Sequence, residues 1–202
     1  MSRQRVSTYV LYLILLTAAP AYPGAQQYEP LSASVKARMS KSVSDVAPDR
    51  ITYGNATAVS EWLNEMGRRL QRRLPDPAIR QDFLNALHYE ATRAGLDPEM
   101  ILGLIEVESN FRKYAVSSAS ARGLMQVMPF WIDVIGAKEH NLFHLRTNLR
   151  YGCTILRHYL DIERGDLFRA LGRYNGSLGR PEYPDLVLGA WKRNWTYDSP
   201  RL

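Results

Sequence analysis

Residues 97–109 read DPEMILGLIEVES, and they contain the start, one face and the end of a single helix. Asp97 followed by Pro98 is the N-cap and first-position pattern that opens an α-helix. The residues that recur at spacings of three and four, and therefore share one face, are Ile101, Leu104, Ile105 and Glu108. The pattern predicts a helix over 98–109 with a carboxyl group on its apolar face.

The position of Glu108 predicts an unusual carboxyl group. Loss of hydration on an apolar face disfavours the charged form and raises the pKa. The negative end of the helix dipole acts in the same direction near the C-terminus, whereas Glu106 points about 160° away. We therefore expect Glu108 to stay protonated near neutral pH, as a general acid requires. The alternative is a glutamate at the edge of the stripe that reaches water.

Similar helical patterns recur after residue 56 and predict an all-α fold. Asp76-Pro77 and Asp166 are further N-cap signals, and Pro75 and Gly95 are stop signals. The expected helices are 59–74, 77–95, 98–109, 146–162, a short one that Asp166 caps and Asn175-Gly176 ends, and a last one from about residue 184. Period-2 runs of β-branched residues are missing there, so we expect one globular domain of about six to eight helices without substantial sheet.

Composition narrows the class of protein further. The 202 residues carry 26 basic and 20 acidic side chains, a formal net charge of +6, and one cysteine. A single cysteine excludes an internal disulfide and cysteine-clustered zinc or iron–sulfur sites. The arginines at 68, 69, 72 and 73 lack interleaved aromatic residues, so we expect a solvated face and no nucleic-acid partner. His140 and His144 lack a third metal ligand, and Cys153 is expected to be a buried thiol.

The N-terminal segment has the pattern of a secretory signal peptide. Arg3 and Arg5 precede an apolar run over 6–19, followed by small residues that end at Ala21. About 14 apolar residues fall short of the roughly 17–25 that span a bilayer. We expect residues 1–21 to be removed and the protein to be exported to the periplasm or cell envelope; an uncleaved membrane anchor is the alternative.

Residues 22–56 are rich in Ser, Ala, Pro and Gln. We expect them to form a flexible tether, with a weak helix near residues 31–43. The globular domain is then expected over residues 57–202, a length that can bury a core of its own.

Four motifs occur in order from Glu108 onward. Residues 108–111 read ESNF, 115–129 read AVSSASARGLMQVMP, 148–152 read NLRYG and 173–177 read RYNGS. Together they resemble the soluble lytic transglycosylase (SLT) domain, a relative of goose-type lysozyme, over about residues 80–195. Two positions depart from the family pattern: Ser120 stands where the family usually has glycine, and Gly176 is displaced by one residue.

The resemblance implies a lysozyme-like fold and a peptidoglycan lytic transglycosylase. Such an enzyme cleaves the β-1,4 bond between N-acetylmuramic acid and N-acetylglucosamine and leaves 1,6-anhydromuramic acid ends, without a metal or other cofactor. Glu108 matches the family's single catalytic acid/base. Ser117, Met125, Gln126 and Tyr174 match positions that line the sugar-binding groove.

Other interpretations stay open at this point. A lysozyme-type muramidase would use the same acid, and a non-catalytic peptidoglycan-binding or secretion-apparatus accessory protein would keep the groove alone. The expected partners are peptidoglycan glycan strands, with cell-envelope secretion or division machinery as a further alternative. Glu182 precedes the last helix, where the match is too loose to assign it a role.

Overall fold

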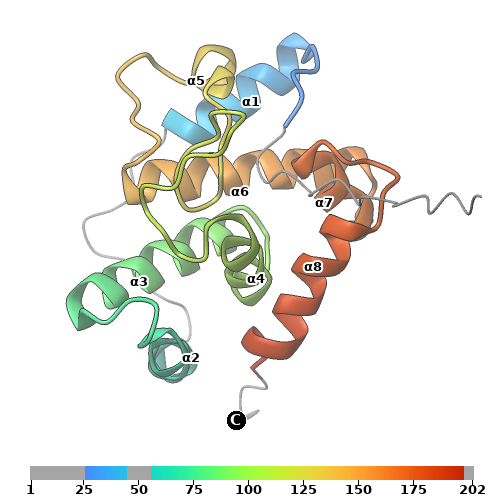
Figure 1. Cartoon of the computed structure of the whole chain (residues 1–202). Helices are drawn as coiled ribbons and strands as arrows, with labels where there is room; N and C mark the ends of the chain where they lie inside the picture. The colour runs from blue at the N-terminus through green and yellow to red at the C-terminus, as the bar shows by residue number, and fades with distance from the viewer. Residues whose placement is uncertain (1–25, 45–55, 198–202) are drawn as a thin grey trace, which may run out of the picture.

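The computed structural model describes residues 26–44 and 56–197, and helices form its framework (Figure 1). In chain order these are α1 (Ala33–Ser44), α2 (Ala56–Leu70), α3 (Pro77–Arg93), α4 (Pro98–Ser109), α5 (Phe130–Ile135), α6 (Leu145–Ile162), α7 (Leu167–Asn175), α8 (Glu182–Ala190) and a π-helical turn, η1 (Trp191–Trp195). The described residues contain isolated β-bridges but no sheet. The all-α prediction is confirmed.

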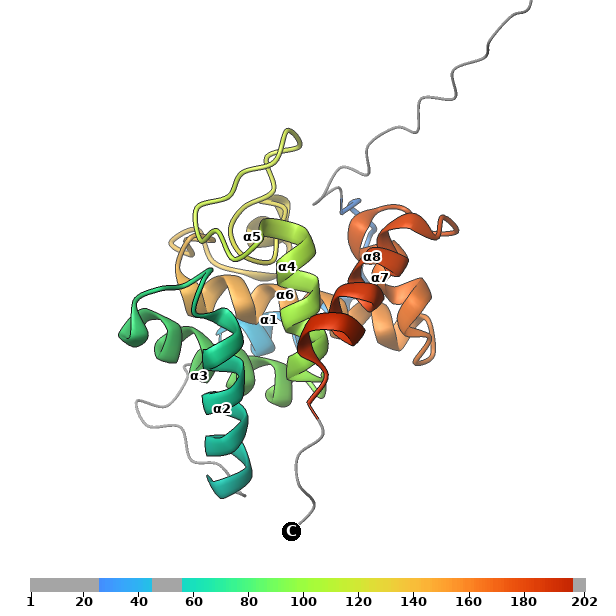
Figure 2. The same cartoon turned by 60° about the horizontal axis from the view of Figure 1, so that its bottom comes forward.

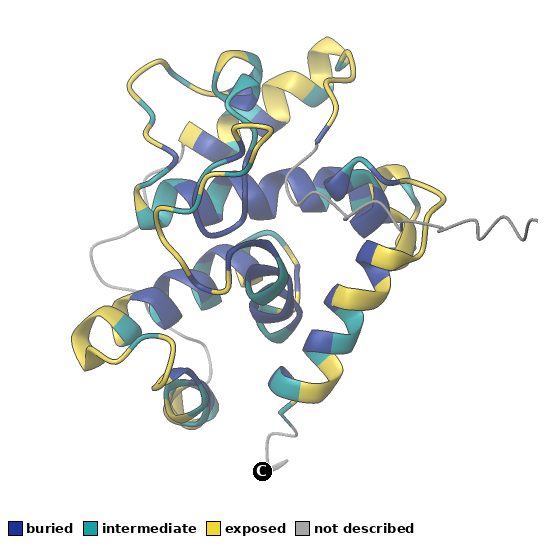
Figure 3. Ribbon diagram, in the orientation of Figure 1, coloured by how far each residue is buried: buried dark blue, intermediate teal, exposed yellow. Residues whose placement is uncertain are grey.

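Helix α4 lies at the centre of the molecule. It packs against α3 on one side and against α8 and η1 on the other, and Figure 2 shows it between these groups. Eight of its twelve residues are buried, and Figure 3 shows the same concentration of buried residues along α6. This enclosure holds two polar residues near the C-terminal end of α4, Glu108 and Ser109, inside the protein.

The helix starts predicted at Asp76, Asp97 and Asp166 are confirmed. Asp76, Asp97 and Asp166 each accept hydrogen bonds from backbone N–H groups in the first turn of the helix that follows. These bonds satisfy donors that have no partner within the helix. Such caps involve residues two or three positions apart, so the sequence alone reveals them.

Two helix predictions differ from the structure. Helix α2 covers Ala56–Leu70 rather than 59–74, and it ends at Leu70 because Arg73 and Leu74 both donate their backbone N–H to the Leu70 carbonyl in a tight turn. Helix α5 was not predicted, since its six residues are too few to show a helical period.

The structure also differs from the flexible tether expected over 22–56, within the part that it describes. Residues 33–44 form α1, close to the predicted weak helix, and α1 packs against α5 and α6. Met39 and Val43 are buried there because a spacing of four places both on one face. The signal peptide assigned to residues 1–21 lies outside the described residues. None of the helices within the described ranges has the length and apolar character needed to cross a membrane.

The Asn148-x-x-x-Gly152 motif of α6 holds the loop between α4 and α5. Asn148 accepts from the Met125 N–H at 2.8 Å and donates to the carbonyls of Arg122 and Leu142. One turn later, Gly152 lies under the Met125 side chain. A Cβ at position 152 would lie 2.3 Å from Met125 Sδ and 2.8 Å from Met125 Cβ. The motif therefore has two parts. Asn148 holds the loop backbone by hydrogen bonds, and Gly152 lets the Met125 side chain approach α6 more closely than any other residue at position 152 would allow.

We expect Gly152→Ala to lower the free energy of unfolding by about 2 kcal/mol, because overpacking of a filled core strains its neighbours. Rotation of Met125 cannot relieve the contact, since its Cβ is part of it. Urea denaturation measures the effect. Gly67→Ala in α2 is the matched control: the new Cβ would lie 3.8 Å from Leu84 Cδ1, and alanine is the better helix former by about 1 kcal/mol. Equal effects of the two substitutions would contradict this account.

Candidate functional site

Glu108 lies in the last turn of α4 and is 4% exposed. The Tyr183 hydroxyl, near the start of α8, donates to Glu108 Oε1 at 2.5 Å. Glu108 Oε2 is also buried, and it has no hydrogen-bond partner among the described residues. The packing of α4 on α8 thus leaves one carboxyl oxygen of Glu108 hydrogen-bonded to Tyr183. The other oxygen, Oε2, is the one that can carry the proton of the neutral acid.

Burial controls the ionisation of this group. It raises the Glu108 pKa to about 8, and the hydrogen bond from Tyr183 opposes it more weakly by favouring the carboxylate. This direction agrees with the expectation from the apolar stripe of α4. A carboxylic acid in this state is protonated at neutral pH and can donate its proton.

Glu106, two residues earlier, has a different environment. Its carboxylate accepts from Arg73 at 2.7 Å, from Trp195 Nε1 at 2.7 Å and from the side-chain amide of Asn194. These partners follow α2 and belong to η1, so Glu106 ties both segments to α4. The wheel prediction that the two carboxyl groups point to different sides is confirmed.

Three of the predicted groove residues, Met125, Gln126 and Tyr174, are buried. Tyr174 donates its hydroxyl to the Met125 carbonyl at 2.7 Å, and its pKa is raised mainly by burial and next by the charge of Glu108. Gln126, in a left-handed conformation with φ of 46°, donates its side-chain amide to the carbonyls of Gly123 and Ala115. All three side chains support the loop from within, and their contact with sugar remains a prediction.

Ser117 occupies a different position, in a tight turn of the same loop. Its hydroxyl accepts from the Ala121 N–H at 3.1 Å, and its own N–H donates to the Ala121 carbonyl. Within this turn Ser120 has φ of 69°, the left-handed region that favours the glycine of the family pattern. No contact within the described residues joins Ser117 to Glu108.

Sequence reasoning missed two residues at this site. Tyr183 is buried against Glu108, whereas its neighbour Glu182 is exposed. Gln26, in the segment expected to be a tether, donates to the Gln126 carbonyl at 3.1 Å and accepts from the Met128 N–H. Neither residue belongs to a motif, and their partners are 75 to 102 positions away, so the sequence offered no signal for either.

The described residues contain no group of three or more His, Cys, Asp or Glu side chains that could hold a metal ion. His140 Nδ1 lies 2.7 Å from the Tyr151 hydroxyl oxygen. Cys153 is buried, and burial raises the pKa of its thiol, which keeps it in the unreactive protonated form.

The raised pKa of Glu108 predicts a pH-dependent stability. Between about pH 4.5 and pH 8 the folded protein binds a proton at Glu108 that the unfolded chain has released, so stability falls as pH rises. We expect Glu108→Gln to be more stable than the wild type by a margin that grows across this window to a few kcal/mol, on the order expected for such a shift. Denaturation at pH 4.5, 6 and 8 measures the margin. Glu106→Gln is the control, and it should destabilise the protein because charge-assisted hydrogen bonds are lost.

We expect Tyr183→Phe to raise the Glu108 pKa further, since the lost hydrogen bond favours the carboxylate. Carbon-detected NMR titration of the side-chain carboxyl groups measures this, with the Glu108→Gln spectrum identifying the signal. Tyr174→Phe removes a hydroxyl that binds the Met125 carbonyl instead, so its effect on that pKa should be smaller. An unchanged titration in Tyr183→Phe would contradict the assigned contact.

Comparisons with known proteins agree with the family that the motifs indicate. Residues 85–182 match the sequence model of the Transglycosylase SLT domain. The chain is 47% identical over 115 residues to "Membrane-bound lytic murein transglycosylase C" of Histophilus somni (strain 2336), covering 49% of this chain and 32% of that protein. It is 51% identical over 49 residues to the protein of the same name from Actinobacillus pleuropneumoniae serotype 5b (strain L20), covering 24% and 13%.

Among solved structures, an inactive mutant of the lytic transglycosylase Slt from Pseudomonas aeruginosa is similar, with a TM-score of 0.44 and 20% identity over 76% of this chain and 33% of that one. The chain therefore spans about a third or less of the length of these relatives. The matched segment begins before α4 and ends at the first residue of α8, so it includes Glu108 and all four motifs. Residues 85–182 are a transglycosylase SLT domain.

Proposed function

We propose that the protein is a murein lytic transglycosylase that cleaves the β-1,4 bond between N-acetylmuramic acid and N-acetylglucosamine, with Glu108 as acid and base. The family supports the reaction class. The observation that carries the proposal is a buried carboxyl group, whose pKa is raised by that burial, at the position of the family's acid.

The environment of Glu108 favours a mechanism with one carboxyl group. Hydrolytic glycosidases place two carboxyl groups about 5 to 9.5 Å apart, and a second carboxylate at that range would raise the pKa of the first through its charge. Burial alone raises the pKa of Glu108, and no other carboxylate of the described residues contributes to the shift. In the proposed mechanism the nucleophile is a hydroxyl group of the substrate.

The steps balance without water. Glu108 donates its proton to the glycosidic oxygen as the bond to C1 of muramic acid breaks. The 6-hydroxyl oxygen of the same sugar attacks C1, and the Glu108 carboxylate accepts the proton of that hydroxyl. The product carries a 1,6-anhydro ring, and Glu108 is protonated again. Intramolecular attack benefits from the high effective concentration of a tethered nucleophile.

The Tyr183 hydroxyl supports the alternation between acid and base. The neutral form is favoured by burial, and the carboxylate formed in the first step is stabilised by the donated hydrogen bond. Opposed contributions of this kind bring the two forms closer in free energy than burial alone would allow.

Location and partners belong to the same proposal. The named relatives are called membrane-bound, and the first residues of the chain resemble a signal peptide. We place the protein in the cell envelope, where peptidoglycan strands are its substrate. A role beside secretion or division machinery is an alternative that gene neighbourhood would test.

Digestion of purified peptidoglycan followed by mass spectrometry tests the reaction. We expect muropeptides 18 Da lighter than hydrolysis products, which is the mass of one water from the reaction stoichiometry. Glu108→Gln should lose activity by about a hundredfold or more. Glu106→Gln is the control, and its activity is compared with that of the wild type at an equal fraction of folded protein. Activity should decline above about pH 8 as Glu108 loses its proton. Reducing ends alone would indicate a muramidase, and binding without release would indicate a non-catalytic protein.

A further inference from the structure

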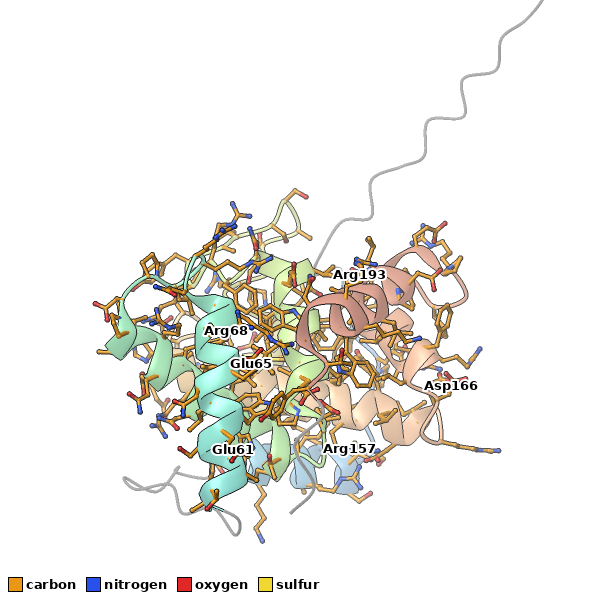
Figure 4. The ribbon with its side chains drawn as sticks, turned by 90° about the horizontal axis from the view of Figure 1, so that it is seen from below. Glu61, Glu65, Arg68, Arg157, Asp166 and Arg193 are labelled. Carbon is orange, nitrogen blue, oxygen red and sulfur yellow. The ribbon has the colours of Figure 1, made fainter. Side chains whose placement is uncertain are left out.

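A surface pocket of about 460 Å³ lies between the C-terminal end of α2 and the turn η1. Three of the arginines that we expected to form a solvated face line it, together with one arginine of η1, and its lining contains no acidic side chain. Figure 4 shows Arg68 on α2 and Arg193 on the turn beside it. The lining includes neither Glu108 nor the loop that follows α4, so the proposed reaction does not explain these arginines.

Arg69 forms part of the pocket wall, and its donors are largely used within the protein. Its guanidinium donates to Glu65 at 2.7 Å and to the backbone carbonyls of Asn194 and Thr196 at 3.0 Å each. The charge of Glu99 adds a further attraction to Arg69. Arg69 therefore joins α2 to η1 and leaves little of its own charge for a ligand.

Arg73 is held in a fixed orientation at the same pocket. Its Nε donates to Asn110 Oδ1 at 3.0 Å, and its Nη2 donates to Glu106 at 2.7 Å. Its Cζ atom lies 5.6 Å from the ring centre of Phe111 and 5.8 Å from that of Trp195. These contacts fix the plane of the guanidinium group and do not use its second terminal nitrogen, Nη1.

Arg193 and Arg68 provide further donors that the protein does not use. Arg193 is exposed, and within the described residues its side chain forms no hydrogen bond or ion pair. Its guanidinium lies against α8, where a Cβ at Gly189 would be 2.7 Å from Arg193 Nη1. Arg68 donates to Glu65 through Nε and Nη2 and keeps Nη1 unused. The pocket thus has one guanidinium group without a carboxylate partner in this part of the chain, and two others that each keep a free terminal nitrogen.

We propose that this pocket binds a phosphate group, with Arg193 as its main ligand and with Arg68 and Arg73 as additional donors. A carboxylate has two oxygens in one plane and is matched by a single guanidinium fork. A phosphate group has three or more acceptor oxygens in a tetrahedral arrangement, so it can accept from guanidinium groups on two different elements. A water molecule occupies about 30 Å³ in the liquid, so the pocket has room for a phosphate group that keeps part of its hydration.

Calorimetric titration of the full chain with inorganic phosphate in chloride buffer tests the site. We expect one ion per chain, and about tenfold weaker binding in Arg193→Gln, which loses a charged hydrogen-bond donor. Lys192→Gln is the matched control, because Lys192 is the exposed neighbour of Arg193 and lies outside the pocket lining. Both substitutions remove one positive charge. Lys192→Gln should change the affinity by less than about twofold, since salt screens charges that do not contact the ligand.

Glu65→Gln supplies a variant with the opposite expected effect. It removes the carboxylate that competes for Arg68, so it should bind phosphate more tightly than the wild type. Circular dichroism confirms that each variant is folded. Should Glu65→Gln fail to fold, the comparison of Arg193→Gln with Lys192→Gln still decides the question. Absence of phosphate binding by the wild type, or equal losses of affinity in Arg193→Gln and Lys192→Gln, would overturn the proposal.

The source of the phosphate group is a separate question with its own measurement. Full-length wild type and Arg193→Gln are sedimented with phosphatidylcholine vesicles that contain or lack phosphatidic acid. Extra binding that needs both phosphatidic acid and Arg193, and that inorganic phosphate displaces, supports a lipid headgroup. Calorimetric binding without this extra sedimentation supports a soluble phosphate compound.

Discussion

The enclosure of α4 is the constraint on which the rest of the structure depends. Helices α3 and α8 and the turn η1 cover it, so the carboxyl group near its C-terminus has little access to water. Desolvation of an ionised carboxylate is costly, and the group remains neutral instead. The chemistry proposed for Glu108 is thus a consequence of helix packing and needs no specialised neighbour beyond Tyr183. Glu106, on the same helix, has a polar environment instead, because it accepts hydrogen bonds from the Arg73 guanidinium and the Asn194 amide.

The loop that follows α4 has little regular structure, yet its position is strongly determined. Asn148 satisfies one backbone donor and two backbone acceptors of the surrounding chain, and Gly152 lets Met125 settle onto α6. Tyr174 adds a bond from α7 to the same residue. Irregular backbone needs such partners because its polar groups lack the regular bonding of a helix. The motifs of this family therefore describe how a loop is held beside a buried acid.

The N-terminal segment is part of this arrangement rather than a separate attachment. Gln26 bonds to the backbone around Gln126, and α1 covers part of α5 and α6. Gln26 therefore ties the segment that precedes α1 to the loop that carries Gln126.

The sequence by itself determined the helix starts, the all-α class and the buried position of Glu108. Asp-Pro caps and helical spacing involve residues a few positions apart, so their effect can be derived without the fold. The sequence could not identify Tyr183 as the partner of Glu108, or the docking of α1 on α5 and α6. Those features depend on residues that meet across long stretches of chain, 75 positions for Glu108 and Tyr183. Only the packing of the helices decides which of many such pairs come into contact.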